Sequence, residues 1–394
     1  MKSILLTTKR FAFLLIFTGF VFVLLQCSKS EFSDDEEHFT PIVPLFDYSS
    51  IAFIARITEN SADWSLCTMD KSGNNMRKIV DMTVACQKPV RSHCGTRLLF
   101  TSVKFDRWVN PDNSVGMSSE YELYIVNTDG TALTLIDRID RTESGMFGAF
   151  DWSPDGKHIV YVKLTFNTDR IEDRDLILYN ISNKTRSILR TEGKVCNPKF
   201  SPTGKYIAYC AEVKGEVIIP SYHNHHIYKM DVNGRNNRLI IRNAATPIWS
   251  PQGDRIAYSA FGAENALQIF VANADGSNQR QLTHTMSPQI WPGPWARDGN
   301  DDPQWMPDGK RIVYVSRENK RSEIFIMNAD GSNQTRLTQA EFGDIHPEIT
   351  PDGKNILFSS GRSYTTDGGI FVMSMDGNEQ EMISKSGYNS VVCR

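Results

Sequence analysis

The stretch that decides the fold reads W-S-P-D-G-K-H-I-V-Y and runs from Trp152 to Tyr161. A divergent copy, R-S-H-C-G-T-R-L-L-F, aligns with it without gaps at 91–100. The other copies are F-S-P-T-G-K-Y-I-A-Y at 200–209, W-S-P-Q-G-D-R-I-A-Y at 249–258, W-M-P-D-G-K-R-I-V-Y at 305–314 and I-T-P-D-G-K-N-I-L-F at 349–358. Repeats about 45 to 60 residues apart are typical of the blades of a β-propeller.

Each copy predicts a β-hairpin. Proline fixes φ at the second turn position, aspartate hydrogen-bonds its own backbone, and glycine accepts positive φ. The aromatic residue before the turn ends one strand on its buried face. The period-two alternation after the turn, as in Ile159 and Tyr161, begins a second strand.

A second motif follows each hairpin, and it reads I-F-V-A-N-A-D-G-S-N-Q-R-Q-L-T at 269–283. At 176–189 the turn becomes Ser182-Asn183, where we expect asparagine to take the left-handed backbone. The remaining copies lie at 64–79, 123–131, 227–235, 324–338 and 370–378. Two hairpins make one four-stranded blade, so the sequence predicts an all-β propeller.

The S-P-D-G-K and D-G-x-x-x-x-x-L-T signatures resemble the TolB-type propeller repeat and cover roughly residues 50 to 394. The count of second hairpins favours seven blades. The seventh is closed by an innermost strand from 387–392, because closure removes open sheet edges. A six-bladed ring with frayed ends is the alternative. TolB carries an α/β domain before its propeller, but only a short tether precedes the first strand here, so the role of TolB in the Tol system is not implied.

The first residues indicate export. Lys2, Lys9 and Arg10 precede an apolar run from Phe11 to Leu25, which suits a signal peptide. Cys27 then resembles the lipidated cysteine of a bacterial lipobox, although Gln26 stands where that family prefers a small residue. An uncleaved anchor or a plain signal peptide is the alternative.

The expected organisation is therefore a signal peptide with lipobox at 1–27, a flexible tether at 28–45 and a propeller at 46–394. Ser28 and the acidic run at 34–37 resemble sorting signals of Gram-negative lipoproteins. We therefore expect an outer-membrane lipoprotein that faces the periplasm or the cell surface, held at the membrane by its lipid anchor.

The amino-acid composition limits the classes of partner that the protein is expected to bind. The net charge is −3, with 43 Lys+Arg against 46 Asp+Glu, and this balance gives no reason to expect nucleic acid as a partner. Of the seven cysteines, those beyond Cys27 are compatible with disulfides in an exported protein or with buried free thiols.

Three long loops are expected on the face opposite the short turns, at 102–120, 211–225 and 284–303, and variable loops on a rigid scaffold concentrate function. Aromatic side chains there would offer contact area for a ligand, or would pack each loop against its blade. The candidate ligand-binding residues are Arg107, Trp108, Tyr222, Trp291, Trp295 and Asp302.

Histidines on the same face are candidate ligands of a transition metal, because imidazoles from separate blades could meet at the mouth of the propeller. They are His223, His225, His226, His284 and His346. A solvated loop end is the other interpretation of 223–226. Asp302 could instead cap a loop or line a calcium site. No other cofactor is indicated.

Two functions remain open. The first is a non-catalytic binding protein for a protein, peptide or glycan. The second is a glycan-degrading enzyme, either a hydrolase or a metal-dependent lyase resembling oligogalacturonate lyase. That family has H-x-H before a proline, whereas Asp344 and His346 stand before Pro347 here. The absence of G-x-S-x-G, H-E-x-x-H and phosphate-binding motifs favours binding.

Overall fold

The computed structural model describes residues 50–55, 64–70, 72–82, 84–85, 89–109, 115–141, 143–166, 172–212, 225–263, 266–286, 299–317, 321–339, 343–361, 369–384 and 388–391. All of these lie in one compact unit, Pro41–Arg394. The expected signal peptide, tether and lipidation site at Cys27 lie outside the described residues. Within them every element is a strand, and no helix is long and apolar enough to cross a membrane.

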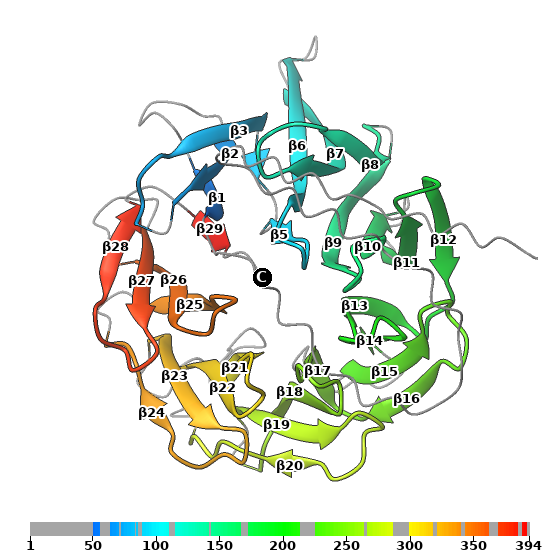
Figure 1. Ribbon diagram of the computed structural model, residues 1–394. Helices are drawn as coiled ribbons and strands as arrows, with labels where there is room; N and C mark the ends of the chain where they lie inside the picture. Colours follow the sequence, from blue (N-terminus) through cyan, green and yellow to red (C-terminus); the bar gives the residue numbers. More distant parts are fainter. Residues whose placement is uncertain are drawn as a thin grey trace, which may run out of the picture. The chain divides into compact units, whose positions relative to one another are not determined.

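Seven antiparallel sheets surround a common centre, which confirms the predicted all-β propeller (Figure 1). From the centre outward, blade 1 comprises β29 (Tyr388–Val391), β1 (Ile51–Ala55), β2 (Trp64–Met69) and β3 (Arg77–Met82). In blade 2, β4 (Val84–Ala85) and β5 (Val90–Arg91) share the inner position, followed by β6 (Arg97–Val109), β7 (Val115–Asn127) and β8 (Thr134–Ile139). Blade 3 comprises β9 (Ser144–Trp152), β10 (His158–Phe166), β11 (Glu172–Asn180) and β12 (Thr185–Leu189).

The other four blades follow the same inner-to-outer order. Blade 4 comprises β13 (Lys194–Phe200), β14 (Tyr206–Glu212), β15 (His225–Asp231) and β16 (Arg238–Ile241). Blade 5 comprises β17 (Ala244–Trp249), β18 (Arg255–Phe261), β19 (Leu267–Asn273) and β20 (Arg280–Gln281). Blade 6 comprises β21 (Asn300–Trp305), β22 (Arg311–Ser316), β23 (Glu323–Asn328) and β24 (Thr335–Arg336), and blade 7 comprises β25 (Asp344–Ile349), β26 (Asn355–Ser360), β27 (Gly369–Ser374) and β28 (Glu381–Ser384).

The first motif forms the expected turn between the inner strand and the second strand of a blade. In blade 3, the Ser153 amide donates to the His158 carbonyl at 3.0 Å, and the Gly156 amide donates to the Ser153 carbonyl at 2.9 Å. The divergent copy has the same two hydrogen bonds. The Ser92 amide donates to the Arg97 carbonyl at 2.9 Å, and the Gly95 amide donates to the Ser92 carbonyl at 2.8 Å. The stretch 91–100 is therefore a true blade repeat.

The second motif forms the turn between the third and fourth strands. In blade 5, Asp275 accepts from the amide of Ser277 at 2.9 Å and from its hydroxyl at 2.6 Å. Gly276 has φ +88°, and a Cβ there would clash with the carbonyl oxygen of Ile240 in the preceding blade, so a larger residue does not fit.

The turn of blade 3 differs from the expectation. The left-handed residue is Lys184, with φ +56°, and not Asn183. Asn183 instead accepts hydrogen bonds from the amide and the hydroxyl of Thr185, at 3.1 and 2.7 Å. Its side chain stabilises the turn, and the left-handed backbone passes to the next residue.

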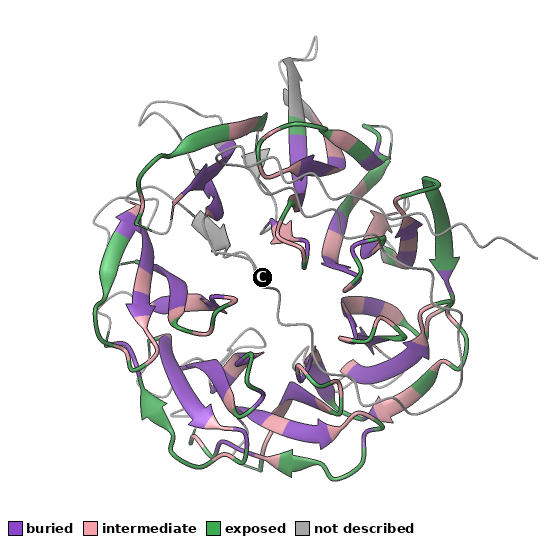
Figure 2. Ribbon diagram, in the orientation of Figure 1, coloured by how far each residue is buried: buried purple, intermediate pink, exposed green. Residues whose placement is uncertain are grey.

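Neighbouring blades are held together by their inner aromatic residues. The Trp152 indole donates to the Val90 carbonyl of the preceding blade at 3.0 Å. Trp249 donates to Lys199 at 3.2 Å, and Trp305 donates to Ile248 at 3.2 Å. Burial follows the same plan, since the strands inside each blade are mostly buried and the outermost strands are mostly exposed (Figure 2).

The ring closes with the C-terminal strand. β29 pairs antiparallel with β1, with Ala52 opposite Val391 and Ile54 opposite Tyr388. This completes a four-stranded blade 1, so the expectation of seven blades is confirmed and the six-bladed alternative is wrong.

The expected loop at 102–120 is largely strand. β6 and β7 pair without a break from Arg97↔Asn127 to Val109↔Val115. Aromatic and β-branched residues favour extended backbone, and each residue finds a partner directly opposite. The connection shortens to the few residues between the strands, and Arg107 and Trp108 lie in β6.

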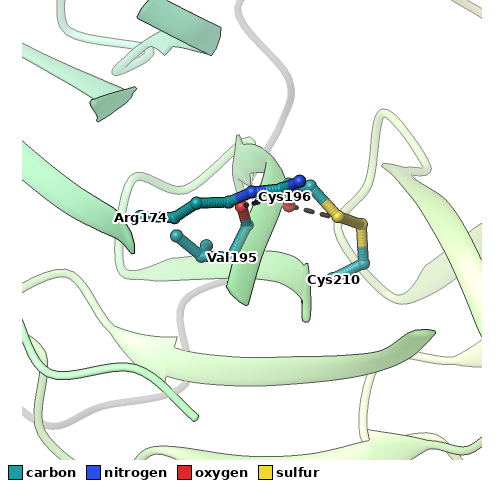
Figure 3. Close-up of a disulfide and its surroundings, with 4 residues drawn as sticks. All are labelled: Arg174, Val195, Cys196 and Cys210. Atoms are coloured by element: carbon teal, nitrogen blue, oxygen red, sulfur yellow. Dashed lines mark hydrogen bonds between the residues drawn. A yellow bond between two sulfur atoms is a disulfide. The ribbon is translucent and has the colours of Figure 1, made fainter. Parts of the chain in front are cut away.

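Both expectations for the cysteines hold in part. Cys196 in β13 and Cys210 in β14 form a disulfide with a Cα–Cα distance of 5.1 Å (Figure 3). Cys67 is a buried free thiol and Cys94 a partly exposed one. Cys86 and Cys393 lie outside the described residues.

Candidate functional site

A β-bulge recurs at the same place in four consecutive inner strands, β13, β17, β21 and β25. Register shifts occur between Cys196 and Lys199, Ala245 and Ile248, Asp301 and Gln304, and Ile345 and Glu348. Within each bulge a non-glycine residue has a left-handed backbone and precedes a proline. These residues, which we call the central ring, are Asn197 (φ +44°), Thr246 (φ +52°), Asp302 (φ +53°) and His346 (φ +54°).

The sequence explains the bulge. Proline has no amide hydrogen and cannot join the ladder, so an X-Pro pair inside a strand is accommodated as two residues opposite one. Each proline is buried, for example Pro303, whereas each residue of the central ring is partly exposed. Each inner strand pairs with the next strand on its outer side, so its other edge faces the centre of the ring (Figure 1). Four polar residues therefore lie at equivalent positions on the inner strands of blades 4 to 7.

The contacts of the central ring differ from blade to blade. Thr246 donates its hydroxyl to the Ser259 hydroxyl at 3.1 Å. Asp302 accepts from the Gln304 amide at 3.3 Å. The neighbouring Asp301 forms an ion pair with Arg317, with an N–O distance of 2.9 Å.

Left-handed backbone is costly for these residues. A non-glycine residue there costs of order 1–3 kcal/mol, and the β-branched Thr246 is the least suited of the four. The structural positions of the repeat keep their residue types from blade to blade, as the proline and the turn glycine do, whereas the central ring reads Asn, Thr, Asp, His. The four positions therefore share one backbone conformation and differ in the chemistry of their side chains.

A buried polar network fixes the start of β21, two residues before Asp302. The Gln268 carbonyl oxygen accepts from the Thr283 hydroxyl at 2.8 Å and from the Asn300 amide at 3.0 Å. The Asn300 amide also donates to the Thr285 hydroxyl at 2.9 Å. Gln268, Thr283 and Asn300 are fully or almost fully buried, so this end of the strand is held rigidly against blade 5.

The candidate histidines that the structure describes lie apart in blades 4, 5 and 7. His225 opens β15 opposite Glu212, and the neighbouring His226 is buried and accepts from the Asn243 amide at 3.2 Å. His284 is exposed beside the Gln281 amide at 3.1 Å, and His346 belongs to the central ring. Among the described residues no three side chains of His, Cys, Asp or Glu are placed to hold a metal ion.

The other candidates divide into two groups. Asp302 lies in the central ring. Arg107 pairs with Met117 and Trp108 with Gly116 in the β6–β7 hairpin, and these pairings concern the backbone. The candidates outside the described residues are Tyr222, His223, Trp291 and Trp295.

Sequence reasoning missed Asn197 and Thr246. The signal that could have found them is the X-Pro pair before the end of four inner strands, in N-P-K-F, T-P-I-W, D-P-Q-W and H-P-E-I. Asp302 and His346 were singled out for their chemistry, and the shared position shows that they belong with Asn197 and Thr246.

Comparison with known proteins agrees with this architecture. Residues 219–393 match the TolB beta propeller domain family. The chain carries a TolB-like β-propeller. An uncharacterized protein of Agrobacterium fabrum is 24% identical over 252 residues, which are 60% of this chain and 76% of that protein. The Tol-Pal system protein TolB of Thioalkalivibrio sulfidiphilus is 33% identical over 101 residues, 25% of this chain and 21% of TolB.

The TolB-like propeller also shares its fold with enzymes. An oligogalacturonate lyase solved in complex with manganese has a TM-score of 0.57 and 14% identity, covering 79% of this chain and 82% of the lyase. At that identity the likeness concerns the fold alone.

Proposed function

We propose that the chain is a lipid-anchored propeller of the cell envelope that binds a peptide segment of another protein at the central ring, without catalysis. The observation that carries this proposal is the repeated bulge, which places different polar residues at equivalent positions on the inner strands of consecutive blades. A rigid scaffold with varied side chains at equivalent positions is suited to selective recognition.

The chemistry of the central ring suits a peptide. Asn197 and Thr246 supply neutral donors and acceptors for backbone amides, while Asp302 and His346 supply groups that recognise a charged or polar side chain. Glycan hydroxyls use the same kinds of hydrogen bond, so the experiment must separate the two ligands.

Export and anchoring belong to the same proposal. The basic residues Lys2, Lys9 and Arg10, the apolar run at 11–25 and Cys27 support a lipoprotein signal. An outer-membrane location would place the propeller in the periplasm or at the cell surface.

The proposal is tested by site-specific photo-crosslinking in the native host. A photoreactive residue replaces Thr246 at the central ring or, as a control, Asp376 in an exposed turn of blade 7. We expect one dominant adduct from position 246 that protease digestion shortens, and no matching adduct from position 376. An adduct that resists protease and yields to glycosidases would replace the peptide with a glycan. Identical adducts from both positions would refute binding at the central ring.

Metal analysis tests the enzymatic alternative. The chain without its first 27 residues is purified without added metal and compared with a His284→Ala, His346→Ala double variant. We expect the two proteins to hold the same amount of metal. Stoichiometric transition metal that the double variant loses would overturn the binding proposal and favour a metal-dependent lyase.

A further inference from the structure

The second turn of each blade, which joins its third and fourth strands, lies in the outer part of the ring and changes its charge from blade to blade. In blade 4 this turn carries Arg235 and Arg238, whereas the same positions and their neighbours in blade 7 carry Glu379 and Glu381. The backbone is alike in both turns, since Asn236 and Glu379 have φ +52° and +53°. The two turns therefore share a shape and differ in charge.

Blade 4 gathers further positive charge around its turn. The Asn237 side-chain amide donates to the Arg190 carbonyl at 3.2 Å, and the Val232 amide donates to the Lys205 carbonyl at 2.9 Å, so two more cationic residues are held beside the turn. We call the four exposed cations at this place the basic sector: Arg190, Lys205, Arg235 and Arg238. Among the described residues between the first and the last of them, Glu192 is the one exposed acid.

Blade 7 carries the opposite charge at the equivalent place. Asp376 lies in its second turn. Asp352 lies in its first turn, which ends at Asn355, and Asn355 pairs with Ser374, where the second turn begins. The four exposed carboxylates form the acidic sector: Asp352, Asp376, Glu379 and Glu381. Among the described residues of this blade, Lys354 is the one exposed cation.

The two sectors lie on opposite sides of the ring, as the outer strands β16 and β28 of their blades do (Figure 1). Because successive strands of a blade are antiparallel, the first and second turns of every blade lie on the same face of the ring. A copy displaced in the plane of the ring therefore brings its acidic sector against the basic sector of its neighbour. One copy cannot present both sectors to a single partner, so the contact is head-to-tail and repeats from copy to copy.

Charge complementarity selects the partner. A second copy of this chain accounts for both sectors, whereas an anionic membrane would account for the basic sector alone. The net charge of −3 is small for a chain of this length, so the repulsion between whole copies is weak and the local charges decide.

We propose that copies of this protein associate side by side, basic sector against acidic sector, in reversible head-to-tail chains. Exposed ion pairs contribute little individually and are screened by salt, so the contact is weak in solution. Anchoring in a membrane would raise the local concentration of the copies and so favour the contact. The inference itself rests on the two sectors and is independent of the central ring.

Sedimentation velocity of the chain without its first 27 residues tests the contact. At about 0.02 M salt we expect species larger than a dimer that grow with protein concentration, and at about 0.5 M salt an association at least tenfold weaker. The double variant Arg235→Glu, Arg238→Glu should abolish the association. The control variant Lys157→Glu, Lys310→Glu changes the net charge equally, at exposed first turns of blades 3 and 6, and should associate as the parent does.

A mixing experiment shows whether the two sectors bind each other. The variant Arg235→Glu, Arg238→Glu keeps its acidic sector, and the variant Glu379→Lys, Glu381→Lys keeps its basic sector. Each should be monomeric alone, because each lacks one half of the contact. Mixed at low salt, they should form a one-to-one heterodimer and nothing larger, because the native contact can form once.

Three outcomes would refute the proposal: a parent that is monomeric at low salt, an association that Arg235→Glu, Arg238→Glu leaves intact, and mixed variants that stay monomeric. Vesicles of anionic phospholipid test the other partner. A parent that does not self-associate but binds these vesicles, and loses that binding with Arg235→Glu, Arg238→Glu, would assign the basic sector to a membrane and equally refute the proposal.

Discussion

Cys94 occupies a turn position whose hydrogen-bond donors suit a carboxylate. In blade 3 the equivalent residue is Asp155, which accepts from the Ser153 hydroxyl at 2.6 Å and from the Lys157 amide at 3.0 Å. In blade 2 the sulfur of Cys94 lies 3.4 Å from the Ser92 hydroxyl and 3.1 Å from the Thr96 hydroxyl. The turn thus presents hydrogen-bond donors to a thiol at the place where three other copies hold an aspartate, Asp155, Asp308 and Asp352.

This environment predicts an acidic thiol. Burial works against ionisation of Cys94, but hydrogen bonds from Ser92 and Thr96, together with the charge of Arg97, lower its pKa below the usual 9.0. Burial raises the pKa of Cys67 to about 11. Thiolate is the nucleophile, so alkylation of Cys94 should reach half its maximal rate below pH 9, while Cys67 should stay unmodified in the folded protein.

Alkylation by iodoacetamide, followed peptide by peptide with mass spectrometry across pH 6–11, measures both thiols in one sample. Ser92→Ala removes one donor and should shift the midpoint of Cys94 to higher pH. A midpoint at or above 9 in the unmodified protein, or one that Ser92→Ala does not move, would contradict the role of the turn.

At the scale of the elements, neighbouring blades are joined by a hydrogen bond that the repeat motif alone does not reveal. In three blades the residue before the turn is a tryptophan that packs against the core. Each of these tryptophans also donates its indole hydrogen to a carbonyl of the preceding inner strand, as Trp305 does to Ile248. Arg255 stacks on the Trp305 ring, 4.7 Å from its centroid, and its guanidinium donates to the Gly309 carbonyl at 3.0 Å. One side chain therefore links blade 5 to the inner strand and the turn of blade 6.

Trp305→Phe should lower the free energy of unfolding by about 1–3 kcal/mol, because the Ile248 carbonyl loses its donor while most of the apolar contact remains. Phe200 occupies the same position in blade 4, so the substitution is compatible with the fold. Chemical denaturation followed by circular dichroism measures the change. Tyr206→Phe, at a side chain 37% exposed, is the control and should change little. Equal stability of all three proteins would show that the indole bond contributes nothing.

Sequence predicted the elements well where turn chemistry is local. The S-P-D-G and D-G turns fix two hairpins per blade without reference to the rest of the chain, so strands such as β10 and β19 were expected at their observed places. The β6–β7 hairpin was expected as a loop because its length depends on pairing between residues that are far apart in the chain, such as Lys104 and Glu120. The left-handed Lys184 depends on how Asn183 bonds the turn, and propensity alone favours asparagine.

At the scale of the whole molecule, the sequence repeats made the number of blades predictable. They revealed only two of the four residues of the central ring. Asp302 and His346 stood out because their side chains carry chemistry. Asn197 and Thr246 joined them only when the inner strands were seen to share a bulge around one axis. Positive φ at these residues results from tertiary pairing of an X-Pro pair, which no local preference of Thr or His predicts.

Closure of the ring rests on one short strand. β29 supplies the inner edge of blade 1, whose β1 residues Ile51 and Phe53 are completely buried. Truncation after Ser384 removes that edge and opens the β1 backbone to solvent. We expect a lower thermal midpoint and concentration-dependent association, because an open, apolar strand edge pairs with other chains.

Thermal unfolding and sedimentation velocity measure both effects on the chain without its first 27 residues. Removal of 392–394 alone keeps β29 and is the matched control, which should behave as the parent does. A synthetic peptide of residues 385–394 should restore the midpoint of the truncated chain by replacing the strand, since the edge of β1 can pair with the backbone of an added strand. A truncated chain that stays monomeric and melts with the parent would show that the first three strands of blade 1 hold the ring closed without β29.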